Sequence, residues 1–193
     1  MPELKLENLS DQELVDLTLK NQENFLYLMK RYQQPLLFYI KRLSNFSNDQ
    51  AEDVLQETFI KTYYNLNDFD KSLKFSSWIY RICHNQLIDS YRKTKTRPQN
   101  IYSNYNDEMI EGIMADFNID REIDKEYLKE KMTKIMAILD FKYREVLILK
   151  FFEGKDYKEM SDILKKPMGT VATLISRAKK QFREKLKDSD LKF

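Results

Sequence analysis

The most regular pattern in this 193-residue chain is a run of apolar and small side chains over residues 51–66. They recur at the spacings i, i+3, i+4, i+7, i+8, i+11, i+12 and i+15, which place side chains on one face of an α-helix. The members are Ala51, Val54, Leu55, Thr58, Phe59, Thr62, Tyr63 and Leu66. The pattern predicts a helix that begins at Asn48 or Asp49 and packs one side against a core. Only three glycines and four prolines interrupt the chain, and β-branched residues seldom alternate with polar ones, so we expect an all-α fold.

Further helices are indicated on both sides of this one. Ser10 and Glu13 have the spacing of a capping box, in which each side chain satisfies a free backbone amide at a helix start. The apolar pattern that follows is expected to be interrupted at Pro35, since proline removes a backbone donor. Another helix is predicted from about Ser76 to Thr94.

Charge is distributed unevenly, although the net charge is only +2. Residues 71–97 carry seven basic side chains against one acidic, residues 98–126 carry two against eight, and residues 165–187 carry eight against one. Two cationic blocks separated by an anionic one indicate two contacts with a polyanion. Two solvated helix faces are the alternative interpretation.

Helical periodicity lapses within the anionic block. We therefore expect two small helical domains, residues 1–97 and 127–193, joined by a flexible acidic linker over residues 98–126. Apolar residues from Met109 to Phe117 allow a short amphipathic segment there that docks transiently.

Residues 156–187 predict a helix-turn-helix. Asp156 and Glu159 form a second capping box, and Pro167 suits the first position of a following helix. In that helix one stripe faces the core, namely Val171, Ile175, Ala178 and Phe182. The outward set is Thr170, Thr173, Ser176, Arg177 and Lys180. A short helix, a tight turn and a long basic helix are typical of a recognition helix in the DNA major groove; a basic hairpin at a protein interface is the alternative.

Several classes of function are excluded by the composition. The single Cys83 permits no internal disulfide and no multi-cysteine zinc site, and we expect it to be a buried structural thiol. The sequence contains no apolar run of about 18 residues and no signal-peptide pattern, so we expect a cytoplasmic protein. It shows no glycine-rich phosphate loop, metal-ligand cluster or nucleophile–base set, so no enzyme activity and no cofactor are expected.

Three stretches resemble the small, two-domain extracytoplasmic-function (ECF) class of bacterial RNA polymerase sigma factors. They are AEDVLQETFIKTYYNL (51–66), FSSWIYRICHNQLIDSYRK (75–93) and YREVLILKFFEGKDYKEMSDILKKPMGTVATLISRAKKQFREKL (143–186). The resemblance covers nearly the whole chain. It implies a factor that binds core RNA polymerase, directs it to specific promoters and promotes DNA opening at transcription initiation.

In this family the first stretch binds the clamp helix of the polymerase. The residues on its face away from the core are Asp53, Gln56, Glu57 and Ile60. An acidic stripe ending in an apolar residue suits a partner helix with basic residues. From the residues alone, a solvated acidic face is the more common explanation.

The second stretch, with the loop before it, resembles the segment that melts and reads the promoter −10 element. The resemblance implies that Asn67, Asp68 and Phe69 help to capture a flipped base, while Asn85 and Arg92 lie along the melted non-template strand. The remaining cations expected at this DNA are Lys71, Lys74 and Lys93. Trp78 and Tyr80 are candidate stacking platforms, although packing better explains Trp78, and we expect His84 to be structural.

The third stretch resembles the domain that reads duplex DNA at the −35 element and contacts the polymerase flap. Ala172 and Leu174 stand where family members often carry basic residues, so we expect weak binding by this domain alone. Arg177, Lys179, Lys180 and Arg183 are then expected to contact mostly the DNA backbone.

The expected linker is long enough to let both domains reach their DNA elements together. Its 29 residues could span roughly 95 Å when extended, against about 70 Å for two duplex turns. The resemblance also implies an anti-sigma partner, with Ile60 and the segment from Met109 to Phe117 as candidate contacts.

A helix-turn-helix regulator that binds duplex DNA as a dimer is the alternative function. It leaves residues 51–66 and the −10 unit unexplained.

Overall fold

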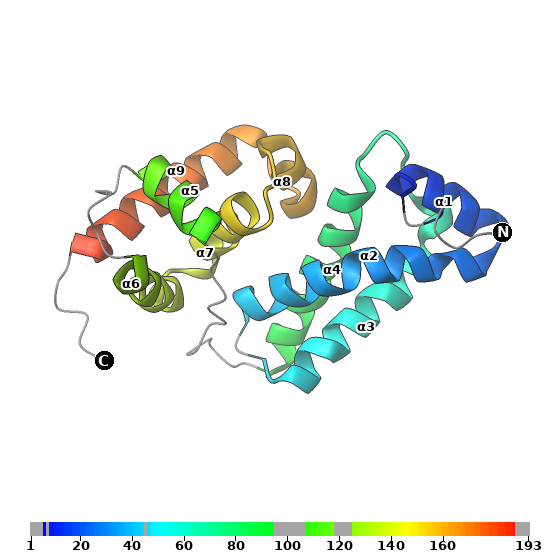
Figure 1. Ribbon diagram of the computed structural model, residues 1–193, viewed down its shortest axis with the longest axis horizontal. Coiled ribbons are helices and arrows are strands. Elements are labelled where there is room, and N and C mark those ends of the chain that lie inside the picture. The colour runs from blue at the N-terminus through cyan, green and yellow to red at the C-terminus, as the bar shows by residue number, and fades with distance from the viewer. Residues whose placement is uncertain (1–5, 7, 45, 95–106, 118–124, 188–193) are drawn as a thin grey trace. The chain divides into compact units, whose positions relative to one another are not determined.

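The computed structural model describes residues 6, 8–44, 46–94, 107–117 and 125–187. Every regular element within these ranges is helical (Figure 1). The chain forms two compact units, the first built chiefly from residues 1–40 and 46–95 and the second chiefly from the rest. The all-α expectation is confirmed.

Within the described residues, the N-terminal unit contains four α-helices and two short 3-10 turns. They are α1 (Asp11–Lys20), η2 (Gln22–Asn24), α2 (Phe25–Leu43), α3 (Asn48–Tyr64), η3 (Leu66–Asp68) and α4 (Phe75–Thr94). Helix α3 begins where its apolar stripe predicts, after a capping box in which Gln50 N donates to Ser47 Oγ at 3.2 Å and Ser47 N donates to Gln50 Oε1 at 3.0 Å. Its stripe packs against the other helices, since residues Ala51, Val54, Leu55, Thr58, Phe59 and Thr62 are all buried.

Helix α2 runs through Pro35 without a break, so the predicted interruption is wrong. Proline removes one amide donor from the helix, but Pro35 itself is exposed. Tyr32, Leu36 and Tyr39 on either side of it are buried in the core. Burial of this apolar face holds the helical path where local propensity alone would end it.

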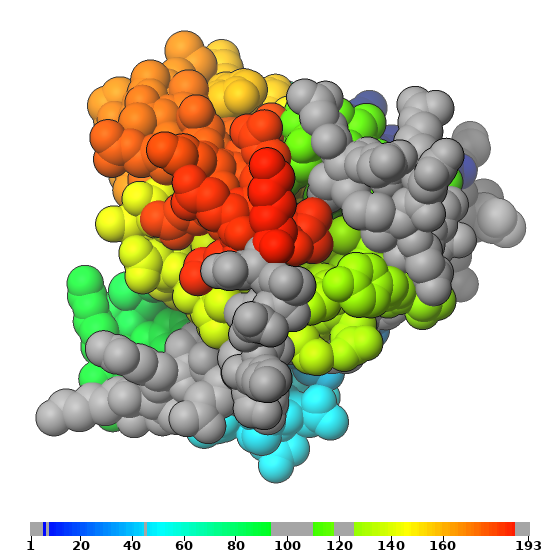
Figure 2. Space-filling model, turned by 90° about the vertical axis from the view of Figure 1, so that its left-hand side faces the viewer, coloured from blue at the N-terminus to red at the C-terminus, as the bar shows by residue number. Residues whose placement is uncertain are grey.

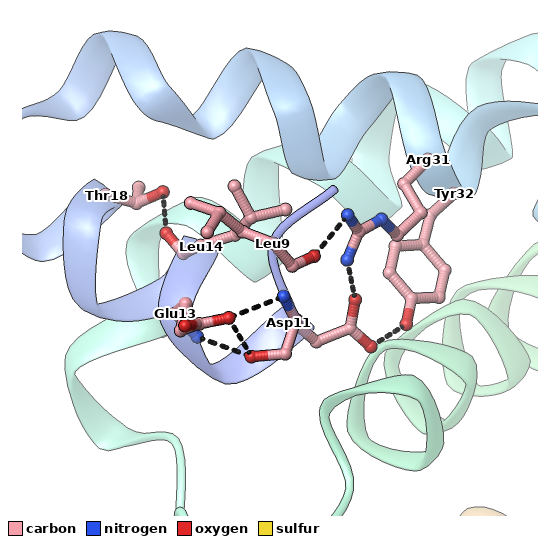
Figure 3. Close-up of polar contacts among 8 residues, drawn as sticks. Leu9, Asp11, Glu13, Leu14, Thr18, Arg31 and Tyr32 are labelled. Atoms are coloured by element: carbon pink, nitrogen blue, oxygen red, sulfur yellow. Dashed lines mark hydrogen bonds and ion pairs between the residues drawn. The ribbon is translucent and has the colours of Figure 1, made fainter. Parts of the chain in front are cut away.

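Helix α1 is fastened to α2 by polar contacts around one carboxylate (Figure 3). Arg31 Nη1 donates to Asp11 Oδ1 at 2.7 Å, and the Tyr32 hydroxyl donates to Asp11 Oδ2. Arg31 Nη2 also donates to the Leu9 carbonyl at 2.6 Å. The predicted capping box of Ser10 and Glu13 is present at the start of the helix. Helix α1 is therefore a fixed part of the N-terminal unit.

The C-terminal unit contains α5 (Asp107–Phe117), α6 (Lys125–Ile138), α7 (Phe141–Leu147), the π-helical turn η4 (Ile148–Phe152), α8 (Tyr157–Leu164) and α9 (Met168–Lys187). Two residues with positive φ make its sharp turns: Gly154 at 61° after η4, and Lys165 at 53° after α8. Ser161 Oγ donates to the Lys166 carbonyl at 2.6 Å across the turn between α8 and α9. Helices α8 and α9 form the predicted helix-turn-helix.

Helix α5 is the short amphipathic segment that the sequence allowed within the expected linker, and residues 107–117 are therefore helical rather than flexible linker. Its apolar face is buried at i, i+3, i+4 and i+7, through Ile110, Ile113, Met114 and Phe117. The Phe117 ring meets Phe151 at 5.4 Å and Phe182 at 5.0 Å between centroids. This apolar contact outweighs the polar composition of the segment. The rest of the predicted linker, except the first residues of α6, lies outside the described residues.

Two further properties bear on function. None of the helices in the described ranges is long and apolar enough to cross a membrane. Among the same residues, no group of three or more His, Cys, Asp and Glu side chains is placed to hold a metal ion.

Candidate nucleic-acid and partner-binding surfaces

The outward face of α3 is open to solvent. Asp53, Gln56, Glu57 and Ile60 are all exposed, opposite the buried stripe of the same helix. The buried threonine hydroxyls are satisfied within the helix, because Thr58 Oγ1 donates to the Val54 carbonyl and Thr62 Oγ1 to the Thr58 carbonyl, both at 2.7 Å. The face predicted to bind a partner is therefore exposed along one continuous helix whose opposite side is buried.

A groove of about 690 Å³ runs between α3 and the last turns of α4. Asp53 and Glu57 line its α3 side, and Arg92 and Lys93 line its α4 side. Arg92 also lies 3.6 Å from Asp89, in an ion pair whose two side chains are both exposed. The structure thus brings the acids predicted to bind a protein beside cations predicted to bind DNA, which the sequence pattern assigned to separate surfaces.

The loop between α3 and α4 presents two polar side chains between two apolar anchors. Leu66 and Phe69 are buried, whereas Asn67 and Asp68 are exposed. Phe69 is only 6% exposed and its ring lies 5.1 Å from that of Trp78. Phe69 is therefore not presented to DNA in this structure; it holds the loop that presents its two neighbours.

The polar side chains of the same region that the sequence assigned to −10 DNA lie on the surface. Lys71, Lys74 and Asn85 are exposed, as the −10 assignment requires. Lys71 Nζ donates to Asp16 Oδ1 of α1 at 2.5 Å. This hydrogen bond lowers the pKa of Asp16 below its usual value. The role of Asp16 was not predicted, because a pair 55 residues apart leaves no local pattern in the sequence.

The aromatic residues of α4 are part of the core. Trp78 is buried as expected, and Tyr80 is buried too, with its ring 5.2 Å from that of Tyr39. The Tyr39 hydroxyl and His84 Nδ1 lie 3.0 Å apart in a hydrogen bond, which confirms a structural histidine. Neither Trp78 nor Tyr80 offers a free ring face for base stacking.

Helix α9 presents the outward face that its sequence predicts. Its buried side is Val171, Ile175, Ala178 and Phe182. Its exposed side includes Thr170, Thr173, Ser176, Arg177 and Lys180. Figure 2 shows this helix, coloured orange to red, lying open across the C-terminal unit. Ala172 and Leu174 stand where family members often carry basic residues. Ala172 is exposed and Leu174 is half-buried.

Lys179 is an exception on this helix. Its Nζ forms an ion pair with Asp116 of α5 and lies 5.8 Å from the ring centroids of Phe117 and Phe151. The expectation that Lys179 contacts the DNA backbone does not fit this structure, because the amine is already held between an acid and two rings. The role of Asp116 was likewise not predicted, because its partner Lys179 lies far away in the sequence.

The turn of the helix-turn-helix is tied to α7 through a buried acid. Glu145 is buried, and Lys166 Nζ donates to its Oε1 at 3.5 Å. Burial raises the pKa of Glu145, and the nearby Lys166 only partly opposes that rise. The contact helps to set the position at which α9 begins.

Comparison with known proteins places both units in a family. The model of Sigma-70 region 2 matches residues 28–97, and that of Sigma-70 region 4 matches residues 129–182. The ECF RNA polymerase sigma factor SigW of Bacillus subtilis is 35% identical over 150 residues, covering 72% of this chain and 76% of SigW. The RNA polymerase sigma-H factor of Pseudomonas aeruginosa is 30% identical over 174 residues, covering 88% and 90%.

Two solved structures share the fold. CnrH, in complex with the cytosolic domain of CnrY, has a TM-score of 0.66 at 22% identity, covering 91% of this chain and 96% of CnrH. The sigma factor RpoE from Bartonella quintana, in complex with the anti-sigma factor NepR, has a TM-score of 0.62 at 20% identity, covering 86% and 99%.

Proposed function

The chain belongs to the ECF sigma factors, non-enzymatic proteins that direct RNA polymerase to promoters, and on that premise we propose which of its surfaces perform each step. The observation that carries the proposal is in the N-terminal unit. There one compact unit presents both an acidic helix face and a polar loop with cations beside it. Docking on polymerase and capture of opened DNA can then proceed on one body.

The polymerase-binding surface is the outward face of α3. Asp53, Gln56, Glu57 and Ile60 meet the clamp helix of core RNA polymerase. Charged hydrogen bonds from basic residues of that helix to the two carboxylates give the contact its strength and register. The C-terminal unit makes a second contact with the polymerase flap.

The −10 surface is the loop after α3 together with the exposed side of α4. Asn67 and Asp68 receive an unstacked base of the melted non-template strand, and Phe69 positions them from within the core. The strand backbone is neutralised by exposed cations along its path. The residues assigned to that path are Lys71, Lys74, Asn85, Arg92 and Lys93. DNA opening then follows from binding the unpaired state rather than from hydrolysis.

The −35 surface is the outward side of α9, which binds duplex DNA at the −35 element. Thr170, Thr173, Ser176, Arg177 and Lys180 are placed to reach bases and phosphates. With only two cations in this set, the domain binds weakly by itself and relies on the polymerase to hold both units on one promoter.

The remaining assignments concern organisation and control. Residues 1–97 and 127–193 act as the two DNA-reading domains, and the protein works in the cytoplasm with the polymerase. An anti-sigma partner holds it inactive, as NepR accompanies RpoE. Ile60 is available for such a contact, whereas the face of α5 formed by Ile110, Ile113, Met114 and Phe117 is buried.

Transcription in vitro tests the proposal. The full chain added to core polymerase should give transcripts that start at defined sites of a genomic promoter pool. Glu57→Lys should weaken binding to core polymerase, while Glu130→Lys, which reverses an exposed acid on α6, should not. Asn67→Ala with Asp68→Ala should leave polymerase binding intact and reduce promoter opening. The proposal would be contradicted if transcription started at no specific site, or if the chain bound a palindromic DNA site tightly without polymerase.

A further inference from the structure

The first two turns of α9 carry exposed apolar groups within the surface that we propose faces DNA. Met168 begins the helix and is 55% exposed. One turn later come Ala172 and Thr173, which are both exposed. The first charged side chain of α9 is Arg177. The start of the helix therefore presents methyl groups and no positive side chain.

The hydroxyl of Thr173 is engaged within the helix. Its Oγ1 donates to the carbonyl of Gly169 at 2.9 Å. A threonine hydroxyl has a single hydrogen to donate, so Thr173 has no donor left for a base or a phosphate while this bond is kept. It offers a partner its methyl group and an acceptor oxygen. Thr173 thus adds a methyl group to those of Met168 and Ala172.

Gly169 allows this surface to lie close to another molecule. It is exposed one turn before Thr173, and a methyl group added to it would meet no atom of the surrounding structure within 4 Å. Its φ is not positive, so neither backbone angle nor packing requires glycine at this position. The missing side chain brings the short side chains of Ala172 and Thr173 nearer to whatever lies against the helix.

The residue types at the start of α9 limit which base they can read. In the major groove Arg and Lys read guanine, Asn and Gln read adenine, and apolar groups such as the methyls of Ala and Thr contact the 5-methyl group of thymine. Residues 168–176 contain no Arg, Lys, Asn or Gln. A recognition helix contacts base edges with its N-terminal residues. Thymine is therefore the base that this part of α9 fits.

We propose that the start of α9 reads thymine in the −35 element through its 5-methyl group. Ala172 and Thr173 contact the methyl group, and Met168 covers it from the beginning of the helix. The contact gives specificity that does not depend on salt, because it releases no counterion. This inference rests on the proposed −35 surface and names the base which that surface reads.

The test uses holoenzyme assembled from the full chain and core polymerase, with −35 duplexes that it selects from a randomised pool. Replacing a thymine by uracil removes only the 5-methyl group. At one or two thymines of the selected duplex this change should weaken binding by about fourfold, the value of one buried methyl group. The factor should be the same at about 0.1 M and about 0.3 M salt.

Substitutions in α9 assign the effect to its methyl groups. Thr173→Ser keeps the hydroxyl and should lower the preference for thymine over uracil to about twofold. Thr173→Val keeps a methyl group and should retain the preference, and Met168→Ala should reduce it in part. Thr133→Ser is the matched control, because Thr133 Oγ1 donates to the Lys129 carbonyl at 3.0 Å on a helix outside the −35 surface. It should leave the preference unchanged.

Two further substitutions test the fit of the helix against DNA. Gly169→Ala should weaken binding to the thymine and uracil duplexes alike without lowering the melting temperature, since the added methyl group meets nothing in the fold. Ala172→Arg should replace the preference for thymine by one for guanine and steepen the slope of log affinity against log salt by about one.

The outcomes separate this inference from the proposed function. If Arg177→Ala and Lys180→Ala weaken duplex binding but uracil binds as well as thymine at every position, the inference fails alone. It also fails if the selected duplexes contain no thymine, or if the uracil effect is unchanged in both Thr173→Ser and Met168→Ala. If no substitution on α9 changes binding to the duplex, the proposed −35 surface fails as well.

Discussion

Helices α1 and α5 each pair an acid with a lysine of their own unit, but the two lysines differ in how exposed they are. Both lie outside the stretches matched by the family models, residues 28–97 and 129–182. Each directs a carboxylate to a lysine of its unit, Asp16 to Lys71 in the first and Asp116 to Lys179 in the second. The side chain of Lys71 is 54% exposed, whereas that of Lys179 is 20% exposed and packs beside two aromatic rings.

The difference shows how burial decides what an ion pair does. Solvent screens an exposed pair such as this one, so it contributes little, and a DNA phosphate can replace Asp16 at Lys71. Lys179 would have to leave an acid and two rings to reach DNA. Lys71 therefore stays available for the −10 contact that we propose, whereas Lys179 links α5 to α9 within the C-terminal unit.

The largest effect is expected from Phe117→Ala. Its ring is almost wholly buried against Phe151 and Phe182, and removal of such a ring costs about 3–5 kcal/mol. Urea unfolding of the C-terminal unit should show a loss of this order, with Tyr127→Ala as a control that changes little. A loss below about 1 kcal/mol would mean that α5 is not an integral part of this unit.

Neighbouring lysines of α9 sharpen the contrast between a structural and a DNA-contacting cation. Lys180→Ala should weaken binding of the full holoenzyme to duplex −35 DNA and reduce the slope of log affinity against log salt by about one. Lys179→Ala should leave that slope unchanged and lower the stability of the C-terminal unit by about 1 kcal/mol. Equal salt slopes for Lys179→Ala and Lys180→Ala would show that the two lysines do not differ in their contact with DNA.

Glu145 provides a pH-dependent comparison with Asp16. Burial raises the pKa of Glu145, so the folded protein binds a proton there more readily than the unfolded chain does. The favourable contribution of Glu145 to the free energy of unfolding is fully present below its pKa of 4.5 in the unfolded chain. It is lost as pH rises through the higher pKa of the folded protein. Glu145→Gln should therefore raise the melting temperature at pH 7, and the gain should disappear at acidic pH. A constant or negative difference across that range would contradict the prediction.

Asp16→Asn is expected to have the smallest effect. Releasing Lys71 should raise the affinity of the holoenzyme for single-stranded −10 DNA by about twofold at low salt, and the gain should vanish with Lys71→Ala in the same chain. Because Lys71 lowers the pKa of Asp16, the pair is present above the ordinary value of 3.8 and is lost as pH falls through the lowered pKa. Fluorescence anisotropy with a labelled oligonucleotide measures the change. A gain that survives Lys71→Ala would assign it to another cation.

Local rules accounted for much of the fold. The capping boxes at Ser10 and Asp156 and the core stripe of α9 were all predicted correctly, because each depends on residues within one or two helical turns. The family resemblance, carried by the same local motifs, was confirmed as well. For the same reason the outward faces of α3 and α9 were named correctly as exposed.

The predictions that failed depended on contacts between distant residues. The path of α2 through Pro35, the docking of α5 and the burial of Phe69 are set by apolar packing against other helices. The lysines differ for the same reason, since Asp16 and Asp116 are far from Lys71 and Lys179 in sequence. The amino-acid sequence by itself therefore determined which helices form and which face of each is polar. Only the tertiary structure decided which charged side chains remain open to a partner, because burial and long-range ion pairs exist only once the helices have packed.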